Sequence, residues 1–140
     1  VIKYMTDPNQ KNKGALIIMD IDNFKNINDE YGHAAGDQAL KNLANILVNT
    51  FRTYDIVARM GGDEFQVFLK NIYDCQIIDK RMQGFLNAVN SQQSLPFTCS
   101  VGICMVNSDD FSYQDALEKA DKALYKSKRN GKNQYSYSDD

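Results

Sequence analysis

The sequence has little net charge and no long apolar run. Its 16 Lys and Arg against 18 Asp and Glu give a formal net charge of −2, which argues against sequence-independent binding of nucleic acid, because such binding needs a basic face. No apolar run approaches the roughly 20 residues that cross a membrane, and no signal peptide is recognisable at Val1. We expect a cytoplasmic protein, or the cytoplasmic part of a membrane protein, without nucleic-acid partners or direct membrane contact.

Cysteine and histidine are too few and too scattered to indicate a zinc or disulfide site. The three cysteines are Cys75, Cys99 and Cys104. They form no C-x-x-C spacing, so buried reduced thiols are expected. His33 is the single histidine, and its surroundings, "YGHAAGD", favour a role in stabilising a loop over metal binding.

The patterns that are present predict a single mixed α/β domain. The 140 residues, 43% hydrophobic and 24% charged, suit one domain with a buried core, 1–140. The continuous apolar run "ALIIMDID" is typical of a central buried strand. The order β-α-α-β-β-α-β-α-β predicts an α/β (α+β) fold, a five-stranded mixed sheet with flanking helices. Strands are expected at 15–22, 55–58, 66–69, 97–106 and 134–138, and the longer helices at 37–51, 73–93 and 111–133.

Several local features refine this prediction. A short helix and a loop through Gly32 and Gly36 are expected at 23–37. Ser112 is a plausible N-cap for the last helix, which should end at Asn130-Gly131. Ile77 and Tyr125 are expected on the buried sides of their helices, and Tyr31 and Tyr113 as packing residues. Residues 1–14 resemble the end of a helix followed by a loop, so the chain is expected to be an N-terminally truncated fragment of a longer one.

The stretch "RMGGDEF" joins two predicted strands of a hairpin and carries paired acids at its tip. Gly61 and Gly62 have no Cβ atoms, so they suit a tight turn and let a ligand approach the backbone. Asp63 and Glu64 are ionised at neutral pH and repel each other. The plain alternative is a good hairpin turn with solvated acids.

Acidic residues also end the first predicted strand, where Asp20 and Asp22 follow the apolar run. If this strand lies beside the hairpin, the carboxylates form a cluster that is electrostatically costly without a cation. Hard oxygen ligands favour Mg²⁺ or Mn²⁺, which commonly bind one or two carboxylates together with substrate phosphates. A helix-capping role for Asp22 is an equally good explanation.

Three long motifs occur together and in order: "DIDNFKNINDEYGHAAGD", "RTYDIVARMGGDEF" and "ADKALYKSKRNGKN". In combination they resemble the GGDEF family, the diguanylate cyclases, over residues 14–137. The resemblance implies a fold like that of the palm-type nucleotide cyclases. It also implies that two GTP molecules, one held by each of two facing domains, are condensed into cyclic di-GMP with release of two pyrophosphates. A homodimer and an upstream sensory domain are then expected.

By this resemblance Asp20 and Asp63 are metal carboxylates, and the Ile21 carbonyl is a further ligand. Glu64 is expected either to bind metal or to help deprotonate the attacking hydroxyl. Asn28 and Asp37 match the positions that recognise guanine, since a carboxylate can accept both the N1–H and the amino N2–H of that base. A favourable acid in a first helical turn is the alternative for Asp37.

Phosphate binding is implied for Lys25, Lys128 and Lys132, with Phe24 and the paired glycines beside them. Lys132 stands where the family usually has arginine. Lysine keeps the positive charge but cannot make the paired, bidentate hydrogen bonds that a guanidinium makes to phosphate. Lys126 and Arg129 are read as ordinary complements of a helix C-terminus.

A product-inhibition site is also implied. "RTYD" matches an R-x-x-D motif in which Arg52 and Asp55 bind cyclic di-GMP, with Arg59 and a second arginine, Arg81, expected to help, the latter from another subunit. The alternative is a helix-end ion pair between Arg52 and Asp55.

Two rival functions remain. The chain could be a non-catalytic GTP or cyclic di-GMP binding regulatory module, although its intact acidic motif argues against that. A palm-like polymerase or structural domain is disfavoured by the weak net charge. The family's usual opening motif, D-x-L-T-G-L-x-N-R, is absent from this sequence.

Overall fold

The computed structural model describes residues 13–51, 55–70, 72, 74–92, 96–107 and 112–139. Within them the order of strands and helices is the predicted one. The elements are β1 (Lys13–Ile21), α2 (Phe24–Tyr31), α3 (His33–Thr50), β2 (Ile56–Gly61), β3 (Glu64–Leu69), α4 (Cys75–Asn90), β4 (Cys99–Asn107), α5 (Tyr113–Arg129) and β5 (Tyr135–Tyr137).

All the strands belong to one mixed sheet in the order β2-β3-β1-β4-β5. The central strand β1 pairs antiparallel with both β3 and β4. The hairpin partner β2 pairs antiparallel with β3, and β5 pairs parallel with β4. The prediction of a five-stranded mixed sheet is therefore confirmed.

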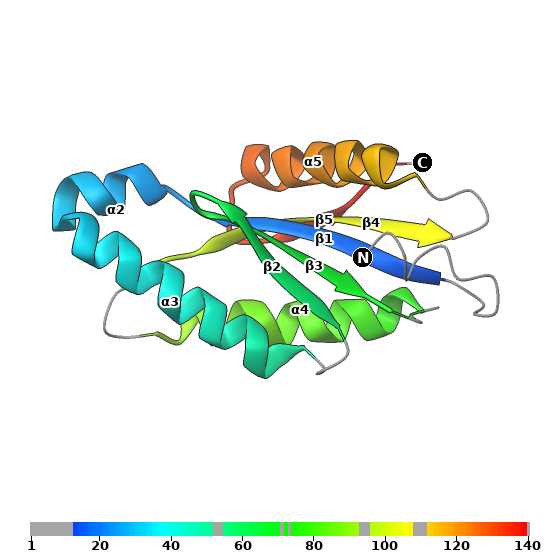
Figure 1. The fold of residues 1–140 in the computed structure, drawn as a ribbon, viewed down its shortest axis with the longest axis horizontal. Helices are drawn as coiled ribbons and strands as arrows, with labels where there is room; N and C mark the ends of the chain where they lie inside the picture. The colour runs from blue at the N-terminus through cyan, green and yellow to red at the C-terminus, as the bar shows by residue number, and fades with distance from the viewer. Residues whose placement is uncertain are drawn as a thin grey trace.

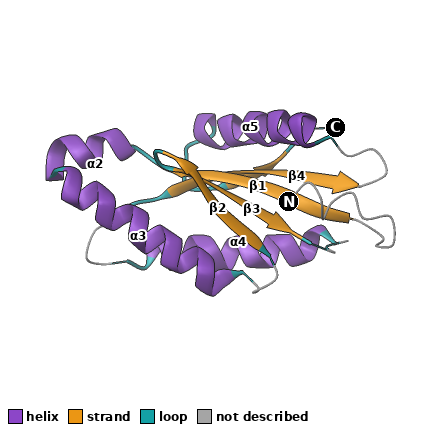
Figure 2. Ribbon diagram, viewed as in Figure 1, coloured by secondary structure: helices purple, strands orange, loops and turns teal. Residues whose placement is uncertain are grey.

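Helices cover both faces of this sheet, and this arrangement explains the unbroken apolar run of β1. Helix α5 lies along one face, and α3 and α4 lie along the other (Figures 1 and 2). Successive side chains of a strand point to opposite faces. Ile17 and Met19 accordingly join the larger core under α3 and α4, whereas Leu16 and Ile18 join a smaller core under α5.

The prediction at 23–37 was partly wrong, because the loop through Gly36 does not exist. Helix α2 ends at Tyr31, one residue separates it from α3, and α3 begins at His33. His33 is thus an exposed helical residue rather than a loop stabiliser. Asp37 lies beyond the first helical turn, so the helix-dipole alternative for it fails.

Three predicted burials were wrong as well. Ile77 is 45% exposed, Tyr125 is 61% exposed and Tyr31 is 62% exposed. Each lies on a helix whose neighbouring apolar residues fill the core. A residue at the edge of the buried face is therefore wrongly predicted as buried when the direction of that face is predicted with a small angular error. Tyr113 does pack, since its hydroxyl donates to Gln66 Oε1 at 2.8 Å.

Other local predictions were confirmed. The Ser112 side chain caps α5 by accepting from the Asp115 backbone N–H at 3.3 Å, and α5 ends before Asn130. Cys99 and Cys104 are buried as expected, whereas Cys75 is exposed, so the expectation of a buried thiol was wrong for Cys75. Residues 1–12 lie outside the described residues, so the expectations for them stay predictions. Within the described residues, none of the helices combines the length and hydrophobicity of a membrane span.

Candidate active site

The register of the central strands places the two predicted acidic segments side by side. Asp20, near the end of β1, is the cross-strand partner of Glu64, the first residue of β3. Directly opposed residues of an antiparallel pair have Cβ atoms about 4.5–5.5 Å apart. The end of β1 and the tip of the hairpin therefore meet at one end of the sheet, beside the C-terminal end of α5 (Figure 1).

The hairpin turn takes the backbone shape for which its glycines are suited. Gly61 has φ +119° and Gly62 has φ +54°, a left-handed region that glycine adopts without steric penalty. The Arg59 guanidinium donates to the Gly62 carbonyl from Nε at 3.1 Å and from Nη2 at 2.7 Å. This bond braces the turn and holds Asp63, a half-buried turn residue, next to β3.

Burial and neighbouring negative charges disfavour ionisation of Asp20 and Glu64 at this end of the sheet. Burial raises the pKa of Asp20, and the charges of Asp63 and Asp22 raise it further, against the opposing effect of Lys128. Burial also raises the pKa of Glu64, and the charges of Asp121, Asp20 and Asp63 add to that rise. Such a site favours the arrival of a positive charge.

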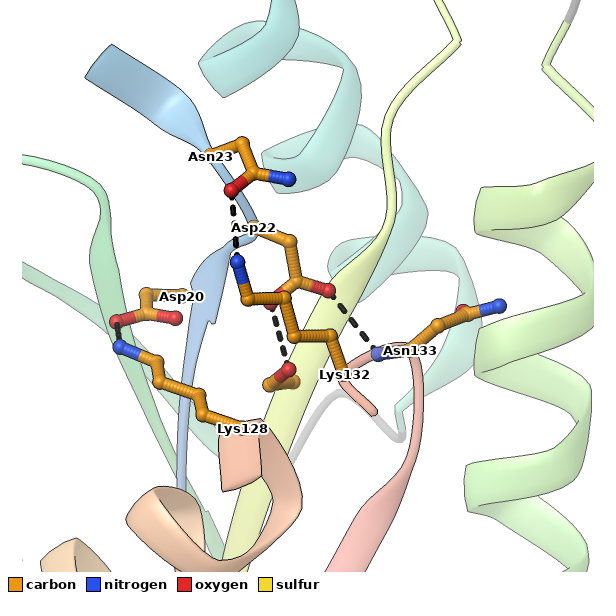
Figure 3. A network of polar contacts seen from close by, with 7 residues as sticks. Asp20, Asp22, Asn23, Lys128, Lys132 and Asn133 are labelled. Carbon is orange, nitrogen blue, oxygen red and sulfur yellow. Dashed lines mark hydrogen bonds and ion pairs between the residues drawn. The ribbon is translucent and has the colours of Figure 1, made fainter. Parts of the chain in front are cut away.

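Lys128 supplies one positive charge from α5. Its Nζ lies 2.6 Å from Asp20 Oδ2, while Asp20 Oδ1 is buried and has no hydrogen-bond partner (Figure 3). A buried carboxylate oxygen without a partner is unusual, and it fits a cation approaching from the side away from Lys128. Among the described residues, no three His, Cys, Asp or Glu side chains form a ready-made metal site. A cation here would therefore need further oxygen atoms from a ligand.

A pocket of about 390 Å³ opens beside these carboxylates. Most of the predicted substrate-binding residues line it, together with Asp22 and Asn23. The lining residues are Ile21, Asp22, Asn23, Phe24, Lys25, Asn28, Asp63, Lys128 and Lys132. The ammonium of Lys132, in the loop after α5, donates to Asn23 Oδ1 at 2.7 Å, and that of Lys128, on α5, donates to Asp20.

Asn28 and Asp37, the predicted base-recognition pair, lie on neighbouring helices. Asn28 is on α2 and lines the pocket, whereas Asp37 is exposed on α3 and lies outside the lining residues. Gly36 lets α2 and α3 approach each other closely at this point, because a Cβ atom there would collide with the Asn28 carboxamide oxygen. This contribution of Gly36 was missed, and only the proximity of the two helices reveals it.

Asp22 does not cap α2, so that alternative was wrong. The residue before α2 is Asn23, and no side chain caps the helix. The Asp22 carboxylate instead accepts hydrogen bonds from the Thr98 and Ser100 hydroxyls and from the Asn133 backbone N–H, at 2.7, 2.6 and 3.1 Å. Thr98 and Ser100 lie more than 70 residues after Asp22 in the sequence, so no local sequence pattern could have indicated that they bind its carboxylate.

The residues predicted for a product site do not lie together: Asp55 directly precedes β2, whereas Arg59 lies near the other end of this strand, at the hairpin turn. Arg52 lies outside the described residues. Asp55 is buried and its Oδ2 lies 3.1 Å from Arg81 Nη1 on α4 of the same chain, although Arg81 was expected to act from another subunit. Asp55 Oδ1 also accepts from the Lys70 backbone N–H at 3.4 Å.

Comparison with known proteins identifies the family. The family model described as "Diguanylate cyclase, GGDEF domain" matches residues 3–134. Diguanylate cyclase A of Treponema denticola is 39% identical over 129 residues, covering 89% of this chain and 35% of that protein. Diguanylate cyclase DgcS of Shewanella oneidensis is 36% identical over 132 residues, covering 92% and 44%. The chain thus spans less than half the length of these relatives.

Solved structures agree in fold. An EAL/GGDEF domain protein from M. capsulatus superposes with a TM-score of 0.82 at 33% identity, covering 94% of this chain and 88% of that one. The GGDEF domain of DgcB from Caulobacter crescentus, solved in complex with c-di-GMP, gives 0.83 at 27% identity, with 90% and 78% covered. From the family match and this shared palm-like architecture, the chain belongs to the GGDEF family of diguanylate cyclase domains.

Proposed function

We propose that the chain is a catalytic diguanylate cyclase domain that condenses two GTP molecules into cyclic di-GMP at the interface of two copies. The observation that carries this proposal is the pairing of Asp20 with Glu64 across β1 and β3, with Asp63 in the adjoining turn. This pairing places the acidic end of the central strand and the hairpin turn together beside a pocket lined by lysines and by Asn28.

In each of the two transfers, the ribose 3′-oxygen of one GTP forms a bond to the α-phosphorus of the other. The bond from that phosphorus to the bridging oxygen of the β-phosphate breaks, and pyrophosphate leaves. The 3′-hydroxyl proton passes to Glu64 or to solvent. Lys25, Lys128 and Lys132 bind the triphosphate, so the protein mainly positions the reactants and stabilises charge.

Mg²⁺ or Mn²⁺ fits the residues at this site. Asp20, Asp63 and the Ile21 carbonyl would hold it, with Glu64 beside them, and the unpartnered Asp20 Oδ1 supports this assignment. When bound, the ion neutralises phosphate charge during phosphoryl transfer. Because Mg²⁺ usually combines one or two carboxylates with substrate phosphates, the absence of a ready-made three-residue site among the described residues agrees with joint binding of ion and nucleotide.

Guanine selectivity is assigned to Asn28 and Asp37. A carboxylate accepts from both N1–H and the amino group of guanine, and adenine offers neither donor at those positions. The position of Asn28 in the pocket, with Gly36 packed against it, supports the assignment. Gly61 and Gly62 leave the turn open to phosphate, and Phe24 forms part of the pocket wall.

Product inhibition is assigned to the region around β2. Cyclic di-GMP would contact Asp55, Arg59 and Arg52, and the Arg81–Asp55 ion pair supports including Arg81 from the same chain. In the whole protein, an upstream sensory domain would control pairing of two such domains in the cytoplasm.

The decisive test compares the chain with Asp63→Asn during incubation with GTP and Mg²⁺, with products separated by chromatography. Wild type should form cyclic di-GMP, and the variant should be slower by at least about a hundredfold, since a metal carboxylate is lost. Asp139→Asn is the matched control, because it removes the same charge from a side chain that is 95% exposed. Equal rates for wild type and Asp63→Asn would contradict the proposed site.

The rival function predicts a different pattern. A non-catalytic regulatory module would bind GTP or cyclic di-GMP without turnover, even when two copies are joined. Binding without product in a covalently linked dimer carrying the preceding N-terminal segment would favour that module.

A further inference from the structure

Asp22 lines the pocket, but both oxygens of its carboxylate accept hydrogen bonds from other groups of the protein. Oδ1 accepts from Ser100 Oγ at 2.6 Å, and Oδ2 accepts from Thr98 Oγ1 at 2.7 Å and from the Asn133 backbone N–H at 3.1 Å. The residue is only 4% exposed. It therefore ties the end of β1 to the start of β4 and to the loop that follows α5.

That loop has an unusual backbone. Gly131, Lys132 and Asn133 have φ values of +120°, +64° and +51° in succession. Lysine rarely adopts a left-handed conformation, and such residues persist only where their surroundings enforce them. Three bonds do so here: Lys132 N–H to the Ser127 carbonyl at 3.0 Å, Gln134 Nε2 to the Lys132 carbonyl at 3.0 Å, and Asn133 N–H to Asp22.

Among these three bonds, the Asp22 bond is the one that fixes the loop backbone to the pocket. The Ser127 and Gln134 bonds hold the loop to itself and to α5, whereas Asp22 belongs to the end of β1, where Asp20 also lies. Figure 3 shows Asp22 and Asn133 joined, with the Lys132 side chain extending from the loop to Asn23. The Lys132 ammonium is thereby held on the same wall as Lys128.

We infer that Asp22 is a positioning residue, which binds no metal itself and holds Lys132 where it meets the nucleotide triphosphate. This inference rests on the proposed function and deepens it. A lysine side chain is flexible and offers a point charge, so its contribution depends on where its backbone is anchored. Removing the anchor should weaken triphosphate binding as much as removing the charge.

The test measures binding of 3′-deoxy-GTP with Mg²⁺ by calorimetry, since this nucleotide lacks the attacking hydroxyl and gives no turnover. Asp22→Ala and Lys132→Met should each raise Kd about tenfold, the loss expected for a charge-assisted phosphate contact. The double variant should be no weaker than Lys132→Met, because Asp22 acts through Lys132.

Two further variants separate this role from metal binding and from general stability. Asp22→Asn keeps one oxygen for Thr98 and Asn133, and its amide can donate to the Ser100 hydroxyl, so binding should stay within about threefold of wild type. Ser100→Ala removes one bond to Asp22 and leaves the Asn133 bond in place. It should lower the melting temperature while leaving Kd within about twofold.

Amide hydrogen exchange gives a readout independent of nucleotide. Exchange at Asn133 should accelerate in Asp22→Ala and not in Lys132→Met. Unchanged exchange, additive effects on Kd, or loss of binding in Asp22→Asn as complete as in Asp22→Ala would each overturn the inference. Failure of the unsubstituted chain to bind 3′-deoxy-GTP would overturn the proposed function itself, and this role of Asp22 with it.

Discussion

At the scale of single residues, the positive charge of Lys128 partly compensates the negative charges of the carboxylates in the site. Burial raises the pKa of Asp20 and of Glu64, and the charge of Asp63 raises both further. Lys128 opposes this rise at both residues, and at Asp20 it does so through a direct bond of 2.6 Å. This lysine therefore limits the rise in the pKa of Asp20 on folding.

Lys128→Met should therefore destabilise the chain more at pH 8 than at pH 4.5. The pKa of Asp20 is raised on folding, so the folded state retains a proton that the unfolded state loses, and stability falls as pH rises above about 4. Without Lys128 that rise in pKa grows. We expect a loss of about 1–2 kcal/mol in the free energy of unfolding at pH 8, reduced by solvent screening because Lys128 is partly exposed.

Urea denaturation at the two pH values measures this difference. Lys126→Met is the matched control, since its ammonium lies 3.9 Å from the exposed Asp139 carboxylate and such a pair contributes little. A loss that is the same at both pH values would contradict the role assigned to Lys128.

At the scale of elements, close packing of α5 on β4 carries Lys128 to the site. A Cβ atom at Gly102 of β4 would collide with the Ala120 carbonyl and the Leu124 amide nitrogen of α5. The helix can lie this close only because the strand has no side chain there. Ser127, fully buried on the same helix, adds a hydrogen bond to the Val101 carbonyl at 2.7 Å.

Gly102→Ala should lower the free energy of unfolding by about 2–3 kcal/mol or more, because the helix backbone must shift. Gly84 of α4 provides the control, since a Cβ atom there meets nothing within 4 Å. Gly84→Ala should raise stability by about 0.5–1 kcal/mol through helix propensity. Thermal or urea unfolding of both variants checks the pair, and a neutral Gly102→Ala would show that α5 can move freely.

At the scale of the whole molecule, the proposed reaction needs two copies. One pocket beside one acidic cluster accounts for one GTP, and each transfer joins the hydroxyl of one nucleotide to the phosphorus of another. The elements that form the pocket lie together at one end of the sheet (Figure 1), so two such ends can face each other.

The specific rate of cyclic di-GMP formation should consequently rise in proportion to protein concentration while the chain is mostly monomeric. A version fused to a parallel dimeric coiled coil should lose this dependence, because the effective concentration is then fixed by the linker. Product assays over a hundredfold dilution series, with sedimentation to report association, provide the measurement. A constant specific rate for a proven monomer would refute the two-copy mechanism.

Patterns in the sequence were sufficient to predict the order of all described strands and helices. A continuous apolar run indicated β1, helical periodicity indicated α3 and α4, and the glycine pair indicated the turn between β2 and β3, because these signals are local. Predictions failed where burial depends on another element: Ile77 and Tyr125 are exposed, and Gly36, predicted in a loop, is a buried residue of α3 that packs against Asn28 of α2.

The same division holds for the candidate site. The sequence by itself determined the family and the residue types, since carboxylates, lysines and paired glycines appear in recognisable motifs. Only the tertiary structure decided that Asp20 faces Glu64, that Lys128 bonds Asp20 and that Asp22 holds the loop carrying Lys132. These contacts join residues 44 to 111 positions apart, and their formation depends on strand register and helix docking, which no local pattern encodes.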